Sequence, residues 1–282
     1  MRIQDFEKLI HNQARARRTL RRVRWRDQRP KRCLKCTYGV LYRLREGRYR
    51  CPRCGYTFGD FTHTWFGQSH LGIENWLWII KLFELEVTAF QAAIQTGVSY
   101  PTVLRAFTTI RRAILAEEQP ELLRQEVEAD ESYFGGRRKG IRGRGARGKI
   151  PVFGILERKG KVSVSVVPNV STRTLMDQTV KLVKRGSLVY TDKYHSYDAL
   201  TFYGYQHLRV DHGLRFSSGR VHINGLEGFW SYAKGKLLKH HGVSPRRFPL
   251  YLYEMQFRYN HRRENLFNLL LSSVLKPVPD LL

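Results

Sequence analysis

Three carboxylates stand in settings that could direct them at one shared pair of divalent cations. Asp130 closes the strand-like run VEAD, Asp192 follows the apolar run SLVY, and Glu227 lies in the helix-like stretch HINGLEGFWSYAKGKL. Hard cations such as Mg²⁺ prefer oxygen ligands, and phosphoryl-transfer sites hold two of them about 3.5–4 Å apart with carboxylates from several segments. Three acids among 24 are by themselves most simply read as ordinary surface charge. The elements around them must decide between a metal site and surface charge.

The stretches around these acids alternate between strand and helix patterns. VFGILERKGKVSVSVV holds two β-branched runs joined at RKG, which predicts a hairpin. STRTLMDQTVKLVKRG has a Ser/Thr start, helical apolar spacing and a Gly stop, which predicts a helix. SLVYTD and YQHLRV predict strands, and SYDALTFYG predicts a short helix or turn. The predicted order β-β-β-α-β-α-β-α therefore places the acids on the first strand, the fourth strand and the last helix.

This order resembles the ribonuclease H-like fold of retroviral-integrase-type recombinases, an α/β core with a mixed sheet flanked by helices. In that fold the first and fourth strands are neighbours, which would bring Asp130 and Asp192 side by side. The segments DESYFGGRRKG, YTDKYHSY, HINGLEGFWSYAKGKL and EMQFRYNHRRENLF closely resemble bacterial and archaeal insertion-sequence DDE transposases with an N-terminal zinc ribbon. The resemblance covers roughly residues 30–270, and the segments occur in the family's order.

The resemblance implies a transposase that binds terminal inverted repeats, cleaves the phosphodiester backbone to free 3′ hydroxyls and joins them to target DNA. Its site would hold two Mg²⁺ or Mn²⁺ ions, with Asp130 bridging both and Asp192 and Glu227 each completing one. The cations would lower the pKa of the attacking water or 3′ hydroxyl and stabilise the leaving 3′ oxygen. We expect double-stranded DNA as the partner and a homodimer or higher oligomer on it.

Two residues, Asn224 and Glu227, are candidates for the third metal ligand. Asn224, Glu227, Ser231 and Lys234 recur at intervals of three or four residues, so they share one helix face. Some members of the resembled family carry Asn in place of the third acid, and a downstream Lys belongs to the family pattern. We expect Glu227 to be the ligand because a carboxylate compensates Mg²⁺ for lost water better than an amide does. Asn224 would then support the site or contact DNA, and Lys234 would contact a phosphate.

Four cysteines form a C-x₂-C-x₁₄-C-x₂-C pattern made of Cys33, Cys36, Cys51 and Cys54. Two close pairs of thiolates suit one tetrahedral, structural Zn²⁺ ion, and no cysteine is left over. The alternative of two disulfides is disfavoured because the chain begins without a secretory signal and so belongs to a reducing compartment. TYGVLYRLREGRYRC between the pairs predicts a hairpin that turns at REG.

The formal charge of +26 on 282 residues points to a polyanionic partner, which we expect to be nucleic acid. A membrane surface is the competing explanation, but no stretch reaches the roughly 18 apolar residues of a spanning helix. We therefore expect a cytoplasmic, nucleoid-associated protein.

Basic residues before the ribbon and after the first predicted strand are candidates for phosphate contacts. Residues 1–32 read as a solvated or disordered arm of modest helical character that either tracks a DNA groove or is simply solvated. Its candidates are Arg17, Arg18, Arg21, Arg22 and Arg24. The glycine-rich loop over residues 135–149 would order against DNA near the carboxylates. Its candidates are Arg137, Arg138, Lys139, Arg142, Arg144 and Arg147.

Residues 71–118 predict helices that fit a helix-turn-helix DNA reader. Gly97 can take the left-handed turn conformation, and Ser99 can cap the second helix with Pro101 in its first turn. Near that helix start, Tyr100, Thr102 and Arg105 could then face a major groove. An ordinary helical hairpin is the alternative.

We therefore predict four parts: a basic arm (1–32), a zinc ribbon (33–60), a helix-turn-helix region (71–118) and a ribonuclease H-like catalytic domain (124–272). At the end of this last part, YLYEMQFRYNHR predicts a helix that buries Tyr251, Met255 and Tyr259 and leaves Arg258 and Arg262 available to DNA. A non-catalytic DNA-binding regulator and a structure-specific nuclease of the same fold are the rival functions. The three acids argue against the regulator, and only a strand-transfer assay separates the nuclease.

Overall fold

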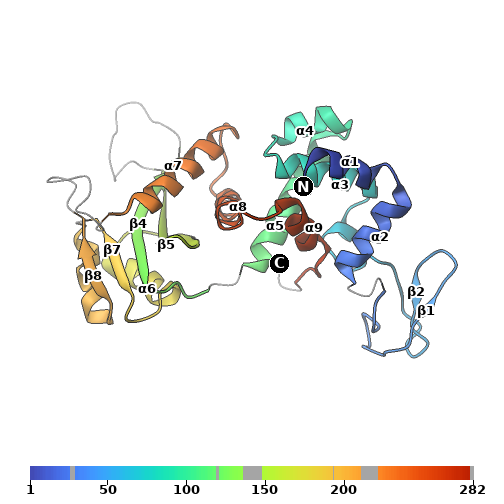
Figure 1. The fold of residues 1–282 in the computed structure, drawn as a ribbon, viewed down its shortest axis with the longest axis horizontal. Coiled ribbons are helices and arrows are strands. Elements are labelled where there is room, and N and C mark those ends of the chain that lie inside the picture. Colours follow the sequence, from blue (N-terminus) through green and yellow to red (C-terminus); the bar gives the residue numbers. More distant parts are fainter. Residues whose placement is uncertain (26–28, 119–120, 136–147, 193, 211–221, 280–282) are drawn as a thin grey trace. The chain divides into compact units, whose positions relative to one another are not determined.

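The computed structural model describes residues 1–25, 29–118, 121–135, 148–192, 194–210 and 222–279. It divides into two compact units (Figure 1). The first consists of Met1–Glu117 together with Arg263–Leu282, and the second consists of Glu118–Arg262.

The second unit is built on a mixed five-stranded sheet whose strand order is β6-β5-β4-β7-β8. The strands are β4 (Glu126–Phe134), β5 (Ile150–Glu157), β6 (Val162–Val166), β7 (Leu188–Thr191) and β8 (Gln206–Arg209). β4 pairs antiparallel with β5 and parallel with β7, so the first and fourth strands of the unit are neighbours. This order confirms the expected ribonuclease H-like mixed sheet, and β5 with β6 confirms the predicted hairpin.

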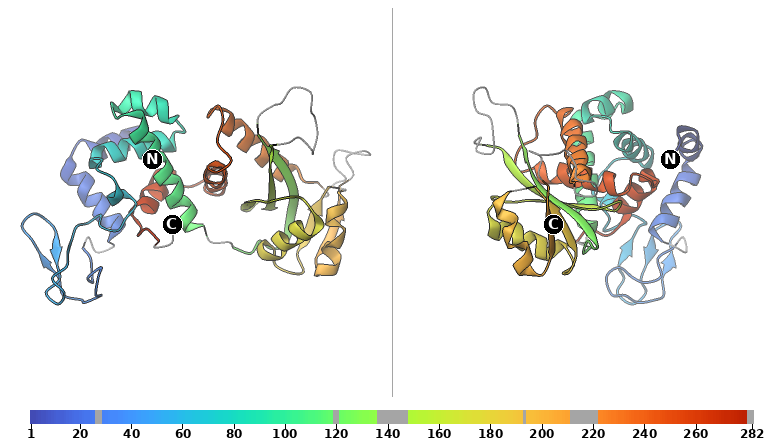
Figure 2. Two further views of the ribbon diagram at one scale, coloured as in Figure 1. Left: turned by 180° about the vertical axis from the view of Figure 1, so that it is seen from behind. Right: turned by 60° about the vertical axis from the view of Figure 1, so that its left-hand side comes forward.

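Helices cover both faces of this sheet (Figure 2). On one face, α6 (Thr172–Leu182) and the 3₁₀ segment η2 (His195–Tyr203) pack against Val127, Ala129 and Phe153. The other face packs against α7 (Asn224–Leu238) and α8 (Phe248–Asn260), which bury Leu226, Phe229 and Leu252. Because side chains alternate along a strand, the even-numbered positions of β4 face α7.

Helix α8 also protects the edge of the sheet at β6. Asn260 accepts a hydrogen bond from the Val162 N–H (2.8 Å) and donates to the Val162 carbonyl (2.9 Å), while Gln256 accepts from the Val164 N–H (2.7 Å). These side-chain amides form hydrogen bonds with backbone groups of the edge strand β6, which would otherwise be free to pair with another strand.

Two expectations for α8 were wrong. Met255 is buried as predicted, but Tyr251 and Tyr259 are only half-buried, and Leu252 is fully buried in the core. Arg258 is also buried, where its Nε donates to Glu254 Oε1 at 2.8 Å, so it is not presented to DNA.

The first unit is mainly helical. It contains α1 (Ile3–Ile10), α2 (Gln13–Arg24), η1 (Phe66–Gln68), α3 (Ile73–Glu84), α4 (Ala89–Thr96), α5 (Tyr100–Glu117) and α9 (Leu266–Leu275). Although α9 follows the second unit in sequence, it packs on α2, α3 and α5. In the parts of the chain that the structure covers, no helix is both long and apolar enough to span a membrane.

The N-terminal residues are a folded part of this unit and not a solvated arm. Phe6, Leu9, Ala16 and Leu20 are buried on α1 and α2, at spacings that place each pair on one helix face. The Phe6 ring lies edge-on to Trp78 (4.8 Å between centroids). The expectation of a solvated arm was wrong because only a few apolar residues stand among the many arginines of α2, yet Ala16 and Leu20 share one face and are buried.

The pair α4–α5 has the local geometry that the sequence predicts. Thr88 caps α4 through the Gln91 N–H (3.3 Å), and Gly97 ends it with φ of 67°. The carbonyl of Ser99 accepts from the N–H of Val103 at 3.1 Å, which starts α5. Val103 and Phe107 are buried, as the pattern requires.

Between α2 and α3 the chain forms a small three-stranded sheet of β1 (Tyr42–Arg43), β2 (Tyr49–Arg50) and β3 (Thr57–Phe58). β1 and β2 form the predicted hairpin, and Gly47 takes φ of 85° in its turn. The core of this ribbon is limited to Cys33, Tyr49, Cys51 and Phe58 with a few half-buried neighbours. So small a core needs a further constraint such as a metal ion.

Replacing Gly154 tests the close approach of α7 to the sheet. A Cβ at this position would lie 2.6 Å from the Trp230 Cζ2 atom, so Gly154→Ala should lower the free energy of unfolding by about 1–3 kcal/mol through overpacking. Urea titration measures the change. Gly228→Ala on the open face of α7 is the control, because nothing lies within 4 Å and alanine favours helix. Equal stability of the two variants would contradict this packing.

Candidate active site

Asp130 lies in the middle of β4 and not at its end. The strand continues for four residues to Phe134, which pairs with Ile150 at the start of β5. Asp130 is opposite Gly154 in this pairing and shares the α7-facing side of the sheet with Glu128. The neighbouring Glu131 faces the other side, where its Oε2 accepts from the buried Tyr197 hydroxyl at 2.8 Å.

Asp192 directly follows β7. In the parallel register of β4 and β7, Glu126 pairs with Leu188 and Glu128 with Tyr190, and continuing it by two residues sets Asp192 opposite Asp130. The Asp192 Oδ1 atom accepts from the Tyr194 N–H at 2.9 Å, which turns the chain away from the strand. The topology thus brings the two aspartates to adjacent positions on neighbouring strands.

The surroundings of Asp130 disfavour its negative charge. Burial, followed by the charges of Glu131 and Asp192, raises the pKa of Asp130 to about 7. A hydrogen bond from the Trp230 Nε1–H to Asp130 Oδ2 (3.0 Å) acts in the opposite direction. The raised pKa means that this carboxyl group holds a proton at higher pH than an ordinary aspartate does. A cation that binds here must displace that proton.

The exposed face of α7 carries Asn224, Glu227, Ser231 and Lys234, as the helical spacing predicts. The opposite face packs on β4 and β5 through Leu226, Phe229 and Trp230. Lys234 Nζ lies 5.6 Å from the centre of the Phe134 ring. Burial lowers the pKa of Lys234, whereas the charge of Asp130 raises it, so the ammonium group and this carboxylate interact.

The three acids do not close into one ligand cluster. Across the described ranges of the chain, the group whose ligand atoms all lie within 4.8 Å of one another is the four cysteines. Asp130, Asp192 and Glu227 instead occupy two adjacent strands and the helix that covers the same face. Asn224, which starts α7, lies one turn before Glu227.

The four cysteines form a tetrad with free thiols. The Sγ atoms of Cys33 and Cys54 are 3.6 Å apart, as are those of Cys36 and Cys51, which is too long for disulfides. The backbone N–H of Tyr38 acts to lower the pKa of Cys36, but burial and hydrogen bonds with the other three thiols raise it to about 12. For Cys33, burial acts to raise the pKa, but the backbone N–H groups of Cys36 and Lys35 and the thiols of Cys54 and Cys36 together lower it to about 7. A lowered pKa favours the thiolate, which is the form that binds metal.

The arginines predicted for α2 divide into two sets. Arg17, Arg18 and Arg22 are exposed. In contrast, Arg21 Nε donates to the buried Asp60 at 2.6 Å, and Arg24 Nη1 donates to the Leu275 carbonyl at 2.9 Å. The second pair therefore holds the helical unit together.

Of the remaining predicted DNA contacts, those at the start of α5 lie in the described part of the chain, and those of the glycine-rich loop do not. Tyr100 and Arg105 are exposed at the start of α5, and Thr102 is half-buried beside them. Arg105 Nη2 lies 3.5 Å from the Thr102 hydroxyl. The six basic candidates of the glycine-rich loop, Arg137, Arg138, Lys139, Arg142, Arg144 and Arg147, lie outside the described residues.

Sequence reasoning missed three residues that organise the site. Glu128 is buried on β4, Arg158 follows β5, and both contact the segment that starts α7. Trp230 was expected only to pack, yet its indole N–H reaches Asp130. Glu128 stands two residues before Asp130, so strand alternation was the available signal for their shared face.

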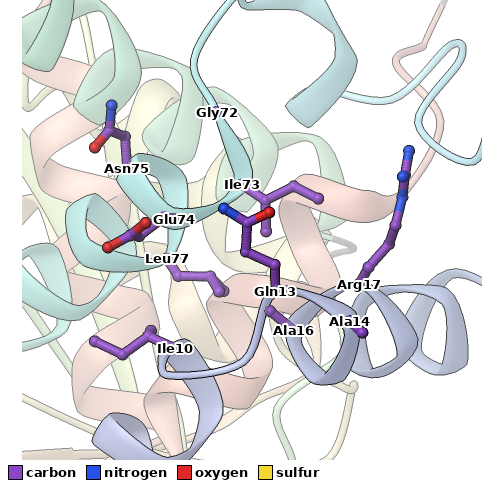
Figure 3. A pocket seen from close by; sticks show the side chains of 10 residues that line it. All are labelled: Ile10, Gln13, Ala14, Ala16, Arg17, Gly72, Ile73, Glu74, Asn75 and Leu77. Carbon is purple, nitrogen blue, oxygen red and sulfur yellow. The ribbon is translucent and has the colours of Figure 1, made fainter.

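A groove of about 570 Å³ lies in the helical unit, apart from these acids (Figure 3). The end of α1 and the start of α2, including Gln13 and Arg17, line one side, and the first turn of α3 with Glu74 lines the other. Its lining is mixed in charge and contains none of the predicted metal ligands.

The comparison with solved structures gives a weak overall likeness. A chain of the simian T-cell lymphotropic virus intasome, in complex with the PP2A regulatory subunit B56 gamma, aligns over 72% of this chain and 77% of its own. The identity is 14% and the TM-score is 0.36. A chain of the pre-cleavage Mos1 transpososome aligns over 72% and 79%, with 13% identity and a TM-score of 0.28. Such values carry no functional argument, and the fold assignment rests on the sheet order.

Sequence comparison is decisive. Residues 122–260 match the ISXO2-like transposase domain. An uncharacterized transposase-like protein of Haemophilus influenzae is 41% identical over 36% of this chain and 84% of its own. An uncharacterized protein in transposable element ISH50 of Halobacterium salinarum is 31% identical over 89% of this chain and 92% of its own. With a relative matched along nearly its whole length and the domain model covering the mixed sheet, this chain belongs to the ISXO2-like transposase family.

Proposed function

We propose that this transposase cleaves the phosphodiester backbone at terminal inverted repeats and joins the freed 3′ hydroxyls to target DNA. Asp130, Asp192 and Glu227 are its metal ligands in this proposal. The observation that carries it is the setting of Asp130, a desolvated carboxyl group beside Asp192 with a pKa raised to about 7. Such a pair is unfavourable when both groups are ionised, and a divalent cation relieves the repulsion.

The proposed ligands fit Mg²⁺ or Mn²⁺, because these cations prefer oxygen ligands. Asp130, Asp192 and Glu227 supply carboxylate oxygens, and Asn224 supplies an amide oxygen nearby. Two bound cations would supply the activation of the attacking hydroxyl and the stabilisation of the leaving oxygen. The protein's own residues position the ligands. The Trp230 indole N–H donates to Asp130 Oδ2 and orients this carboxylate, and Lys234 contributes positive charge near it. This charge suits a DNA phosphate.

The assignment of the third ligand is tested by substitutions on the exposed face of α7. Glu227→Gln should lower Mg²⁺-dependent cleavage of terminal-repeat DNA by about a hundredfold or more, since even the partners of metal ligands contribute 10–100-fold. Asp130→Asn and Asp192→Asn should have the same effect. Asn224→Ala should leave measurable cleavage. Lys234→Ala should mainly weaken DNA binding, because no metal depends on its charge.

Ser231→Ala is the matched control, because Ser231 lies on the same exposed face between Glu227 and Lys234. Cleavage is measured with labelled terminal-repeat duplexes, and strand transfer with a plasmid target. Cleavage that survives Glu227→Gln and disappears in Asn224→Ala would make Asn224 the ligand. Cleavage without joining would identify a structure-specific nuclease, and DNA binding without either activity would identify a regulator.

We propose that the cysteine tetrad holds one structural Zn²⁺ ion that completes the small core of the ribbon. Four thiol groups within 4.8 Å of one another and two similar backbone turns support the proposal. In these turns the N–H of Thr37 donates to the Cys33 carbonyl, and the N–H of Gly55 donates to the Cys51 carbonyl. Four thiolates in this arrangement suit tetrahedral zinc.

Purified protein should contain one Zn²⁺ ion per chain by elemental analysis. Cys51→Ser should lose the ion and unfold the ribbon, whereas Tyr42→Ala, at an exposed position of β1, should keep it. Acidification should release zinc, because protons compete for the thiolates. Protein without zinc, or with two disulfides by mass spectrometry, would refute the site.

We propose that DNA contacts the exposed arginines of α2 without sequence preference and the start of α5 with preference for the terminal repeat. The charge of +26 and the exposure of Arg17, Arg18 and Arg22 support the first contact. The helical pair with exposed Tyr100 and Arg105 supports the second. Deleting the N-terminal residues is a poor test, since it would remove buried Phe6 and Leu20 from the core.

A triple alanine variant of Arg17, Arg18 and Arg22 should weaken binding to all DNA sequences alike. It should also flatten the plot of log K against log [salt] by about 0.9 for each phosphate that the variant no longer neutralises. Arg105→Ala should instead reduce the preference for the terminal repeat over unrelated duplexes. Fluorescence anisotropy at several salt concentrations measures both effects. An unchanged salt slope in the triple variant would remove α2 from the interface.

A further inference from the structure

Helix α7 begins without a capping side chain of its own. The first N–H groups of a helix need partners from outside its own ladder, and Ile223 at the N-cap position makes no side-chain cap hydrogen bond. A carboxylate from another element fills this role: Glu128 Oε2 on β4 accepts from the Leu226 N–H at 2.9 Å. The same N–H lies 3.1 Å from the Ile223 carbonyl oxygen.

Glu128 is fully engaged inside the protein and is 1% exposed. Besides the Leu226 N–H on Oε2, its Oε1 lies 3.3 Å from Arg158 Nε and 3.5 Å from His222 Nδ1. Both oxygens therefore have partners from the protein, which separates Glu128 from the candidate metal ligands.

Arg158 extends this contact to the strands around it. Its Nη1 donates to Glu126 Oε2 at 3.0 Å, and its Nη2 donates to the His222 carbonyl at 2.7 Å, just before α7. The guanidinium lies 3.7 Å from the centre of the Tyr190 ring on β7, and the Tyr190 hydroxyl donates to Glu126. One arginine therefore joins β4, β7 and the segment that leads into α7.

The positive end of α7 reduces the excess negative charge of this cluster. Glu126 and Glu128 carry two negative charges against one on Arg158, and the N-terminus of a helix contributes roughly half a positive charge. Gly225 permits the close approach, because a Cβ there would lie 2.9 Å from Glu128 Oε2 and 2.5 Å from the Leu156 Cδ2 atom. A shift of α7 would remove the Leu226 N–H donor from the buried Glu128 Oε2 atom, which is costly.

We propose that Glu128, supported by Arg158, is a positioning residue that fixes the first turn of α7 against β4. This turn carries Asn224 and Glu227, and Asp130 lies two residues beyond Glu128 on the same strand face. Glu128 thereby sets the distance between the strand carboxylate and the helix carboxylate. The consequence for metal binding rests on the proposed function, whereas the fixing of α7 does not.

The test uses full-length, zinc-loaded protein and the Glu128→Gln, Arg158→Lys and Gly225→Ala variants. Glu121→Gln is the matched control, because Glu121 forms an exposed ion pair with Lys161 (2.7 Å) in the same unit. Hydrogen exchange by mass spectrometry follows peptides that cover residues 222–230 in protein without Mg²⁺ or Mn²⁺. Mn²⁺ binding is measured by electron paramagnetic resonance, with Asp130→Asn as the reference for loss of the site.

Glu128→Gln should speed exchange in the first turn of α7 and weaken Mn²⁺ binding about tenfold or more, as loss of a ligand's supporting partner does. Exchange in the β5–β6 hairpin should stay unchanged, and Glu121→Gln should match the wild type in both readouts. If Glu128→Gln does not fold, Arg158→Lys and Gly225→Ala carry the test, because both loosen the same turn and keep the carboxylate.

The two proposals fail in different ways. Unchanged exchange over residues 222–230 in every folded variant would overturn the positioning role, whatever the metal affinity. Equal Mn²⁺ binding by the wild type and Asp130→Asn would refute the proposed metal site and leave the exchange result standing. Faster exchange with unaltered Mn²⁺ binding would show that Glu128 holds the helix but does not set the metal site, which also overturns the inference.

Discussion

The parallel pairing of β4 with β7 is the constraint on which the rest of the second unit depends. It brings the end of β7 beside the middle of β4, so Asp192 lies close enough to Asp130 to raise its pKa, although sixty-one residues lie between them in the sequence. Because side chains alternate along β4, the same pairing sends Asp130 and Glu128 towards α7 and sends Glu131 towards Tyr197. A register shift of one residue would exchange these faces and separate the acids.

Helix α7 is held by polar contacts at one end and by close packing in its middle. Glu128 and Arg158 engage its first turn, whereas Gly154 leaves room for the Trp230 ring against the sheet. The indole N–H can reach Asp130 only because this ring lies so close to the strand. The packing of the Trp230 ring and the orientation of the Asp130 carboxylate therefore depend on the same contact, so a change in one alters the other.

The helical unit uses its positive charge in two ways. Arg21 and Arg24 make internal contacts with Asp60 and the Leu275 carbonyl, which join α2 to the region after the ribbon and to α9. Arg17, Arg18 and Arg22 stay exposed on the same helix. The many arginines of α2 are thus compatible with a compact unit, because a buried apolar stripe of Ala16 and Leu20 faces the core while the exposed arginines face solvent.

The sequence by itself determined the order of strands and helices, the cysteine spacing, the exposed face of α7 and the turn at Gly97, because each depends on local periodicity or on one residue's backbone preference. It predicted the neighbouring aspartates only through a family resemblance. Tertiary structure decided the roles of Glu128, Arg158 and Trp230, the burial of Arg258 and the packing of α1, α2 and α9. These depend on contacts between residues that are distant in sequence, which no local pattern encodes.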